Sequence, residues 1–141
     1  MKKILIVNSN YYKVVSNNLN NIAKKKLLSA NYSVQIVTVP GILEIPIAIR
    51  KNIKKFDGFV ALGCVIKGQT PHFDLICSST FNAILYLTVD FNKPIGNGII
   101  TALNMKQANQ RSKMNKSNQP NKGFEAANAV ISILNNGPKK I

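Results

Sequence analysis

The chain has 141 residues, of which 45% are hydrophobic and 17% are charged, and its formal net charge is +14. This length fits one domain that buries a substantial core, and this composition excludes an intrinsically disordered chain. No apolar run reaches the roughly 18 residues of a membrane span. The first apolar run ends at Asn8, whereas a signal peptide needs about 7–15 apolar residues, so we interpret it as the first strand of a cytoplasmic protein.

The 19 basic residues are scattered along the chain and form no patch interleaved with aromatic residues. This distribution argues against nucleic acid as a partner and favours electrostatic steering of small anions. Cys64 and Cys77 lack the spacing of metal ligands and are too few for a disulfide scaffold. We therefore expect both cysteines to be reduced core residues, and no metal site.

Predicted strands and helices alternate along the chain. Short β-branched runs predict strands, and apolar residues repeating every three or four positions predict helices. In chain order, we expect a strand at 3–8, a helix at 13–29, a strand at 33–39, a helix at 44–54, a strand at 58–65, a helix at 72–90, a strand at 94–101, a helix at 104–112, a polar mobile loop at 112–121 and a helix at 122–135.

This alternation predicts an α/β fold in one domain over residues 1–141. Strands joined through helices predict a parallel sheet covered on both faces, with right-handed crossovers. We expect a three-layer αβα sandwich with a four-stranded parallel sheet, of the flavodoxin-like kind. Ligands of such sheets bind at the carboxyl ends of the strands, so the residues after each strand are the candidates for a site.

The most informative stretch is residues 67–72, Lys-Gly-Gln-Thr-Pro-His, which follow the strand at 58–65 and end on the only histidine. A turn entering a helix presents unpaired backbone N–H groups, which suit an anion. His72 is a candidate for proton transfer beside that anion, because an imidazole can both donate and accept a proton. A plain helix N-cap with a surface histidine fits the same pattern.

Other strand ends carry further candidates. Tyr11 follows the first strand, where it either lies against a planar ligand or packs on its own helix. Glu44 follows the second strand, where it either accepts hydrogen bonds from a polyol or complements a helix dipole. Asn104 follows the fourth strand and fits a helix N-cap. Arg111 and Lys122 flank the polar loop, in positions typical of surface charges.

Three motifs, in order along essentially the whole chain, carry a family resemblance. They are Val-Pro-Gly-x-x-Glu-Ile-Pro at 39–46, Ala-Leu-Gly-Cys-Val-Ile-Lys-Gly-Gln-Thr-Pro-His-Phe-Asp at 61–74, and Asn-Lys-Gly-x-Glu-Ala-Ala at 121–127. The chain resembles the 6,7-dimethyl-8-ribityllumazine synthase family of riboflavin biosynthesis. The resemblance implies a cofactor-free condensation of 5-amino-6-(D-ribitylamino)uracil with 3,4-dihydroxy-2-butanone 4-phosphate, which releases phosphate and water.

The resemblance also implies residue roles by position. His72 would transfer protons, Tyr11 would stack on the pyrimidine ring, and Glu44 would hold the ribityl hydroxyls. Backbone groups of Ile42 and Leu43 would lie near the ribityl chain, and backbone groups of Val65 and Ile66 would lie at the uracil edge, with Lys122 beside them. The phosphate would be bound by Gly68, Gln69 and Thr70, with Arg111 as its cation. Asn97 stands at a position from which a neighbouring subunit offers a residue to the ring.

Five positions depart from the family pattern. Asn10 stands where the family commonly has arginine, and Leu43 and Asn97 stand where it often has aromatic residues. Lys67 replaces arginine, and Gln69 replaces a frequent glutamate. None of these changes removes a proposed proton-transfer or phosphate group, so we expect altered affinity rather than lost activity.

Arg111 precedes Lys122 by 11 positions, a wider gap than the resemblance leads us to expect. The loop must fold back to bring both side chains to one pocket. If it does not, Lys113 or Lys116 is the alternative phosphate partner.

The resemblance implies a homo-oligomer of pentamers, with each site between adjacent subunits. Because the first predicted strand starts almost at the first residue, we expect a pentamer or a pair of pentamers rather than a 60-subunit capsid. Two other functions remain open: a related riboflavin synthase that uses two lumazines, and a catalytically weak binding assembly associated with ligand or nucleic acid. The Gly-Gln-Thr-Pro-His element favours the synthase of the first resemblance.

Overall fold

The computed structural model describes residues 1–113 and 121–141. Its centre is one four-stranded sheet in the order β2-β1-β3-β4, and every neighbouring pair is parallel. This topology confirms the predicted parallel sheet. The strands are β1 (Lys3–Ser9), β2 (Ser33–Val39), β3 (Gly58–Ile66) and β4 (Ile95–Ala102).

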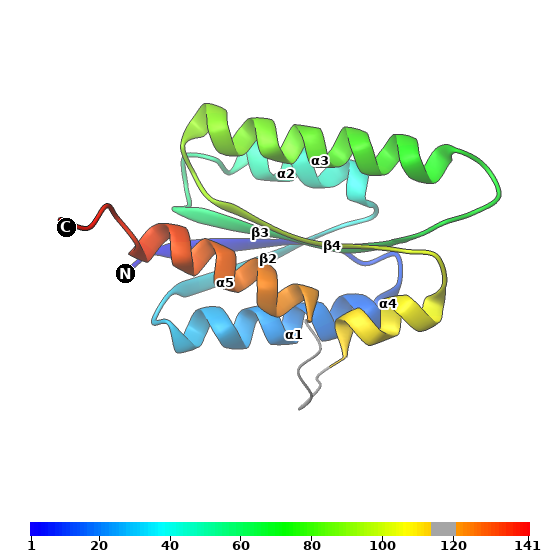
Figure 1. Cartoon of the computed structure of the whole chain (residues 1–141), viewed down its shortest axis with the longest axis horizontal. Helices are drawn as coiled ribbons and strands as arrows, with labels where there is room; N and C mark the ends of the chain where they lie inside the picture. The colour runs from blue at the N-terminus through cyan, green and yellow to red at the C-terminus, as the bar shows by residue number, and fades with distance from the viewer. Residues whose placement is uncertain (114–120) are drawn as a thin grey trace.

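Helices cover both faces of the sheet (Figure 1). One layer holds the short 3₁₀ helix η1 (Ile42–Glu44) with α2 (Ile45–Lys51) and α3 (His72–Phe91). The opposite layer holds α1 (Lys13–Ser29), α4 (Met105–Ser112) and α5 (Lys122–Asn135). The arrangement confirms the three-layer, flavodoxin-like sandwich. In the described part of the chain, no helix has the length and apolar character needed to cross a membrane.

Of the predicted helices, the one at 44–54 has the least accurate boundaries. The chain enters it through η1, and α2 ends at Lys51. Beyond that point the amide of Asn52 donates to the carbonyl of Ile49 at 3.0 Å, and the amide of Lys55 donates to that of Asn52 at 2.9 Å. These bonds to the third preceding residue form turns rather than an α-helix. The helical spacing of apolar residues continues through these turns, so it predicted a longer helix than the structure has.

Alternation along the buried strands divides the core into two clusters, one on each face. Ile4 and Ile6 pack toward α1 and α5, whereas Leu5 and Val7 pack toward α2 and α3. Both clusters consist mainly of buried aliphatic side chains, joined by the aromatic residues Tyr32, Phe56 and Phe59. The core therefore fixes the direction in which each residue at the carboxyl end of β1 points.

Helix α5 approaches β4 through two glycines. A Cβ added at Gly96 would lie 2.0 Å from the carbonyl oxygen of Ala126, and one at Gly98 would lie 2.9 Å from that of Lys122. Side chains at these positions would collide with the helix backbone. The absence of side chains therefore sets how closely the start of α5, with Lys122, packs on the edge strand.

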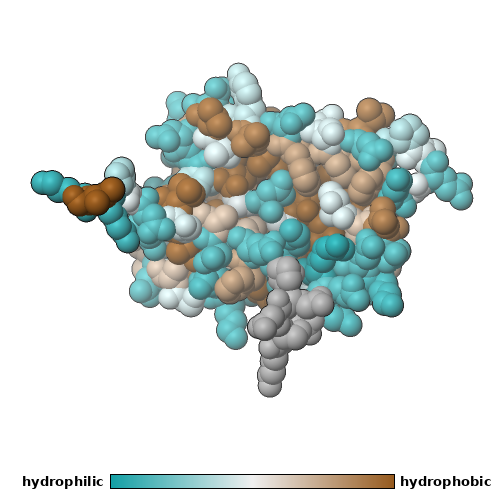
Figure 2. Space-filling view, in the orientation of Figure 1, coloured by the Kyte–Doolittle hydropathy of each residue, from teal (hydrophilic) through white to brown (hydrophobic). Residues whose placement is uncertain are grey.

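The face around α3 and the edge strand β4 carries exposed apolar side chains. Figure 2 shows brown apolar surface across the middle of the visible face, between the upper and lower helices. On α3, Leu75, Leu85, Tyr86 and Val89 are each 64–74% exposed. A patch of this kind is typical of a surface that another protein covers.

Candidate active site

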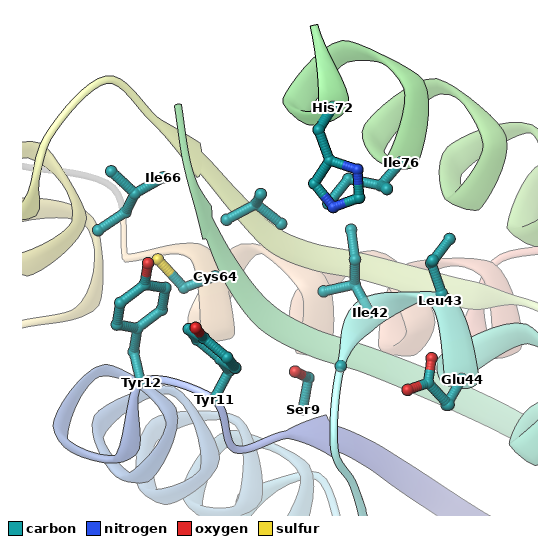
Figure 3. A pocket seen from close by; sticks show the side chains of 12 residues that line it. Ser9, Tyr11, Tyr12, Ile42, Leu43, Glu44, Cys64, Ile66, His72 and Ile76 are labelled. Atoms are coloured by element: carbon teal, nitrogen blue, oxygen red, sulfur yellow. The ribbon is translucent and has the colours of Figure 1, made fainter. Parts of the chain in front are cut away.

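A cavity of about 330 Å³ opens at the carboxyl ends of β1 and β3, beside the turn that follows β2 (Figure 3). This is the edge of the sheet that the fold class predicts for a ligand. Seven of the thirteen predicted site residues line it: Tyr11, Ile42, Leu43, Glu44, Val65, Ile66 and His72. The structure also places there five residues that sequence reasoning did not assign to the site: Ser9, Tyr12, Gly41, Cys64 and Ile76.

Tyr11 stands just beyond β1, on the rim of the cavity. Its side chain is 74% exposed, and it meets Tyr12 edge to face, with ring centroids 5.0 Å apart and planes 77° apart. A T-shaped contact uses the edge of one ring and leaves a ring face uncovered. Tyr11 therefore has aromatic surface available for a planar ligand.

The turn after β2 carries the carboxylate of the site. The amide of Glu44 donates to the carbonyl of Gly41 at 3.2 Å, which closes η1, and Ile42 is buried in the core beneath it. A Cβ at Gly41 would lie 3.5 Å from Glu44 Oε1, so the carboxylate folds back over this glycine. The buried isoleucine thus anchors the turn and holds the carboxylate at the cavity wall.

His72 is the first residue of α3, as the sequence predicted, and it is exposed. Figure 3 shows its imidazole directed from the helix toward the turn that carries Ile42 and Leu43. The first-turn N–H groups of a helix have no intrahelical acceptor, and they make the helix start favourable for an anion. A proton-transfer group and an anion-stabilising helix end therefore lie together at the cavity mouth.

Cys64 and Tyr12 face each other across the inner part of the cavity (Figure 3). Burial raises the pKa of the Cys64 thiol to about 11. Burial also raises the pKa of the Tyr12 hydroxyl, with smaller contributions from Cys64 and Tyr11. Both groups are protonated at neutral pH, so they act as neutral walls and weak donors, and Cys64 is not an activated nucleophile.

Gly68, Gln69 and Thr70 lie in an exposed loop between β3 and α3, and they do not line the cavity. The amide of Lys67 donates to the carbonyl of Ala102 at 2.9 Å, which extends the pairing of β3 with β4 up to the loop. The loop therefore starts where the sheet ends and leads directly to His72. The two ends of the loop are held beside the cavity, but its residues are exposed to solvent.

Arg111 and Lys122 do not line the cavity either. Arg111 is in the last turn of α4, and Lys122 opens α5, where its Nζ lies 3.0 Å from Glu125 Oε2. The side chain of Asn121 donates to the carbonyl of Lys113 at 3.0 Å and so ties together the two ends of the intervening segment. Lys116 and most of the predicted mobile loop fall at 114–120, outside the described residues.

Asn97 lies on β4, away from the cavity of its own chain. It is aligned with Ala61 of β3, and therefore belongs to the sheet face covered by α2 and α3. Its side chain is exposed, and its Oδ1 accepts a hydrogen bond from the amide of Ile99 at 3.0 Å. Strand β4 is at the sheet edge, so this asparagine faces outward from a single chain.

The sequence model of the 6,7-dimethyl-8-ribityllumazine synthase family matches residues 1–137. The chain belongs to this family. It is 43% identical to 6,7-dimethyl-8-ribityllumazine synthase of Bartonella henselae over 135 residues, covering 93% of this chain and 85% of the relative. It is 41% identical to the same enzyme of Bartonella tribocorum over 133 residues (92% and 88%) and 40% identical to that of Zymomonas mobilis over 137 residues (96% of each).

Membership of the lumazine synthase family makes this chain an enzyme, a transferase of riboflavin biosynthesis. Two of the three motifs that carried the resemblance contribute residues to the cavity lining, since residues 41–44 and 64–66 come from them. Among residues 1–113 and 121–141, no group of three or more histidine, cysteine or acidic side chains is arranged to hold a metal ion.

Proposed function

We propose that this chain condenses 5-amino-6-(D-ribitylamino)uracil with 3,4-dihydroxy-2-butanone 4-phosphate to form 6,7-dimethyl-8-ribityllumazine. The observation that carries the proposal is the cavity at the carboxyl edge of the sheet. It gathers an uncovered aromatic ring, a carboxylate and the only histidine from three separate segments. The match to the lumazine synthase family over residues 1–137 supports the same reaction.

In this proposal the pyrimidine lies against Tyr11, with its polar edge at the backbone of Val65 and Ile66. The ribityl chain extends toward Glu44, along the turn formed by Ile42 and Leu43. A carboxylate accepts hydrogen bonds from several hydroxyls at once, and bonds to a charged acceptor are stronger than neutral ones. Among the described residues that line the cavity, Glu44 is the only acidic one, so its carboxylate is the group that would orient the polyol.

The phosphate of the second substrate would lie at the loop 68–70 and the start of α3. Backbone N–H groups at a helix start bind phosphate without any side chain. We propose Arg111 as the cationic partner, with Lys122 at the uracil edge. The hydrogen bond between Asn121 and Lys113 supports this, because it keeps the segments that carry these two cations close together.

The proposed chemistry is a sequence of proton transfers and eliminations. The 5-amino group attacks the ketone of the butanone and loses water to give an imine, then phosphate leaves, and the ribitylamino nitrogen closes the ring with loss of a second water. His72 relays protons at these steps, because an imidazole can accept a proton at one nitrogen and donate one from the other. Donors around the phosphate stabilise the charge that develops as it leaves. Holding two substrates face to face supplies much of the remaining acceleration.

We also propose that the working enzyme is a pentamer, or a multiple of one, in the cytoplasm. The apolar outer face of α3 and the edge strand β4 are the surfaces that a neighbouring copy would cover. Asn97 would then face the ring site of the next subunit rather than its own. Cys64 and Cys77 are free thiols, which suits a reducing compartment.

The test mixes the purified protein with both substrates and follows the absorbance and fluorescence of the lumazine against the slow uncatalysed reaction. We expect saturable acceleration that requires both substrates. A folded, assembled protein with no acceleration would overturn the proposal. It would instead favour the binding-only assembly, which a titration with each substrate alone would then reveal.

A further inference from the structure

Ser9 carries a buried hydroxyl that the proposed mechanism does not use. It is the last residue of β1, it is 2% exposed, and it lines the cavity. Its Oγ has no hydrogen-bond partner among the residues that the structure describes. Buried polar groups in folded proteins are nearly always paired, so an unpaired one that lines a ligand cavity indicates a partner supplied by the ligand.

The strand geometry fixes the side of the sheet that Ser9 faces. Side chains alternate along a strand, and Leu5 and Val7 pack toward α2 and α3. Ser9 therefore points to the same side, where η1 passes above it. Figure 3 shows Ser9 on the cavity floor between Tyr11 and Glu44.

Gly63 of β3 packs beside this hydroxyl, where a side chain would not fit. A Cβ added at Gly63 would lie 3.0 Å from Ser9 Cβ, 3.6 Å from Ser9 Oγ and 3.0 Å from a methyl carbon of Ile42. Any side chain at position 63 would therefore crowd both the hydroxyl and the turn above it. The glycine leaves Ser9 as the one polar side chain at the point where β1, β3 and η1 meet.

The position of Ser9 indicates the chemistry of its partner. An aromatic ring stands on one side of it and a carboxylate on the other, so it lies where a planar ring would continue into a hydroxylated chain. A serine hydroxyl both donates and accepts, which matches the alcohol groups of such a chain. A purely apolar substituent would leave the serine hydroxyl unpaired.

We propose that Ser9 is a specificity-determining residue, whose hydroxyl bonds a hydroxyl of the ribityl chain near its junction with the pyrimidine. The inference rests on the proposed function, because it assumes that a ribitylated pyrimidine occupies this cavity. It adds a second contact to the polyol besides that of Glu44, at the opposite end of the ribityl chain. Together they select a ligand with a polyol over one with the same ring alone.

Thr80 on α3 provides a matched control. Its Oγ1 is also buried and without a partner in the described part of the chain, and the residue is 1% exposed. Thr80 does not line the cavity. Removing either hydroxyl deletes an unpaired buried group from the unliganded protein, so Ser9→Ala and Thr80→Val both leave folding stability unchanged or raised.

The experiment measures Ser9→Ala with two probes. One is 5-amino-6-(D-ribitylamino)uracil, and the other is 5-amino-6-(methylamino)uracil, which keeps the ring but lacks the polyol. We expect Ser9→Ala to weaken binding of the ribityl probe about three- to tenfold, the effect of one neutral hydrogen bond, with turnover number within about twofold. Binding of the methylamino probe stays unchanged, and Thr80→Val changes neither.

A different pattern overturns the inference. Equal weakening of both probes by Ser9→Ala would mean that the serine supports the shape of the cavity, and unchanged affinity for both would mean that its hydroxyl meets no ligand. Failure of the proposed function is distinguishable, because wild-type protein would then show no turnover with both substrates; if it also fails to bind the ribityl probe, both conclusions fall. If wild-type binding and turnover hold while the Ser9→Ala pattern fails, only the inference about Ser9 falls.

Discussion

The proposed pyrimidine side of the candidate site and the proposed phosphate side are built from different kinds of structure. The pyrimidine side consists of strand ends and a short turn anchored by the buried Ile42, and its residues already surround a cavity. The phosphate side consists of an exposed loop at 67–70 and of Arg111 and Lys122, which belong to separate helices and lie outside that cavity. His72 stands between the two sides.

The difference shows which elements organise a site in advance. The positions of strand ends are set by the sheet, whose residues are packed in the core. The side chains proposed to contact the polyol and the ring therefore need to move little when a ligand binds. The loop and the two cations are held by solvent-exposed segments, which have fewer contacts to fix them. We therefore expect the ribitylaminouracil to bind to a surface that is already formed, the prepared side. Arg111 and Lys122, on the unprepared side, are expected to move toward the phosphate only when it binds.

The largest effect is expected from His72→Ala, because this residue serves the chemistry on both sides. We predict a turnover number about 100-fold lower, the lower part of the range for general acid–base catalysis, with both Michaelis constants within about threefold of wild type. Steady-state kinetics measures this. The variant remains slow rather than inactive, since proximity and phosphate stabilisation persist. Complete loss of turnover with substrate binding retained would give the histidine a larger role than proton relay.

The next largest effect is expected from Glu44→Gln, which tests the prepared side alone. Loss of charged hydrogen bonds to the polyol should raise the Michaelis constant for the ribitylaminouracil about 30-fold, and leave that for the butanone phosphate unchanged. Asp90→Asn, which removes an exposed acidic charge from α3, is the control and should change neither. Equal effects of both variants would mean that the change in net charge, not the contact, is responsible.

A smaller effect is expected from Arg111→Ala, which tests the unprepared side. Because its guanidinium must first be drawn to the phosphate, we predict only about a tenfold rise in the Michaelis constant for the butanone phosphate. Arg50→Ala is the control, since Arg50 lies over the ring of Phe91 at 4.6 Å and belongs to α2. An unchanged Michaelis constant in Arg111→Ala would exclude this arginine and leave Lys113 or Lys116 as the partner.

The smallest effect on turnover is expected from Cys64→Ala, within about twofold at pH 7, because the thiol is protonated there. Its effect is on stability at high pH. Burial raises the thiol pKa from 9.0 to about 11, so between these values the folded chain keeps a proton that the unfolded chain loses. The contribution of Cys64 is complete below pH 9 and is lost as pH rises to 11, about 2–3 kcal/mol in all.

Urea unfolding at pH 8.5 and pH 11 measures this contribution. Wild type should lose about 2–3 kcal/mol more than Cys64→Ala across the interval, and the comparison removes the effect of lysine deprotonation common to both. Identical losses in the two proteins would show that the thiol is solvated in the folded state.

The cavity gathers most of the residues predicted to contact the ring and the polyol, but not those predicted to contact the phosphate. Tyr11 and Glu44 lie between a strand and the next α-helix, and His72 begins the helix after β3, so the topology of a parallel sheet was enough to predict that they lie at one edge. Arg111 lies in the last turn of α4, and Lys122 begins α5 after a long polar segment; no sequence pattern states where such helices place their ends. Ser9 and Cys64 were missed because they look like the last core residues of strands, although Ser9 is a polar residue at the end of an otherwise apolar strand.

Three sequence motifs identified the family to which the chain belongs. The order of short strands and helices determined the three-layer fold and the edge of the sheet at which the cavity opens. These follow from the sequence because hydrophobic periodicity and chain connectivity are local or nearly local properties. The tertiary structure decided the rest: the depth of the cavity, the unpaired hydroxyl of Ser9, the burial of Cys64 and the approach of α5 over Gly96 and Gly98. Each of these depends on which atoms from distant segments come into contact, and contact distances are set only when the whole core packs.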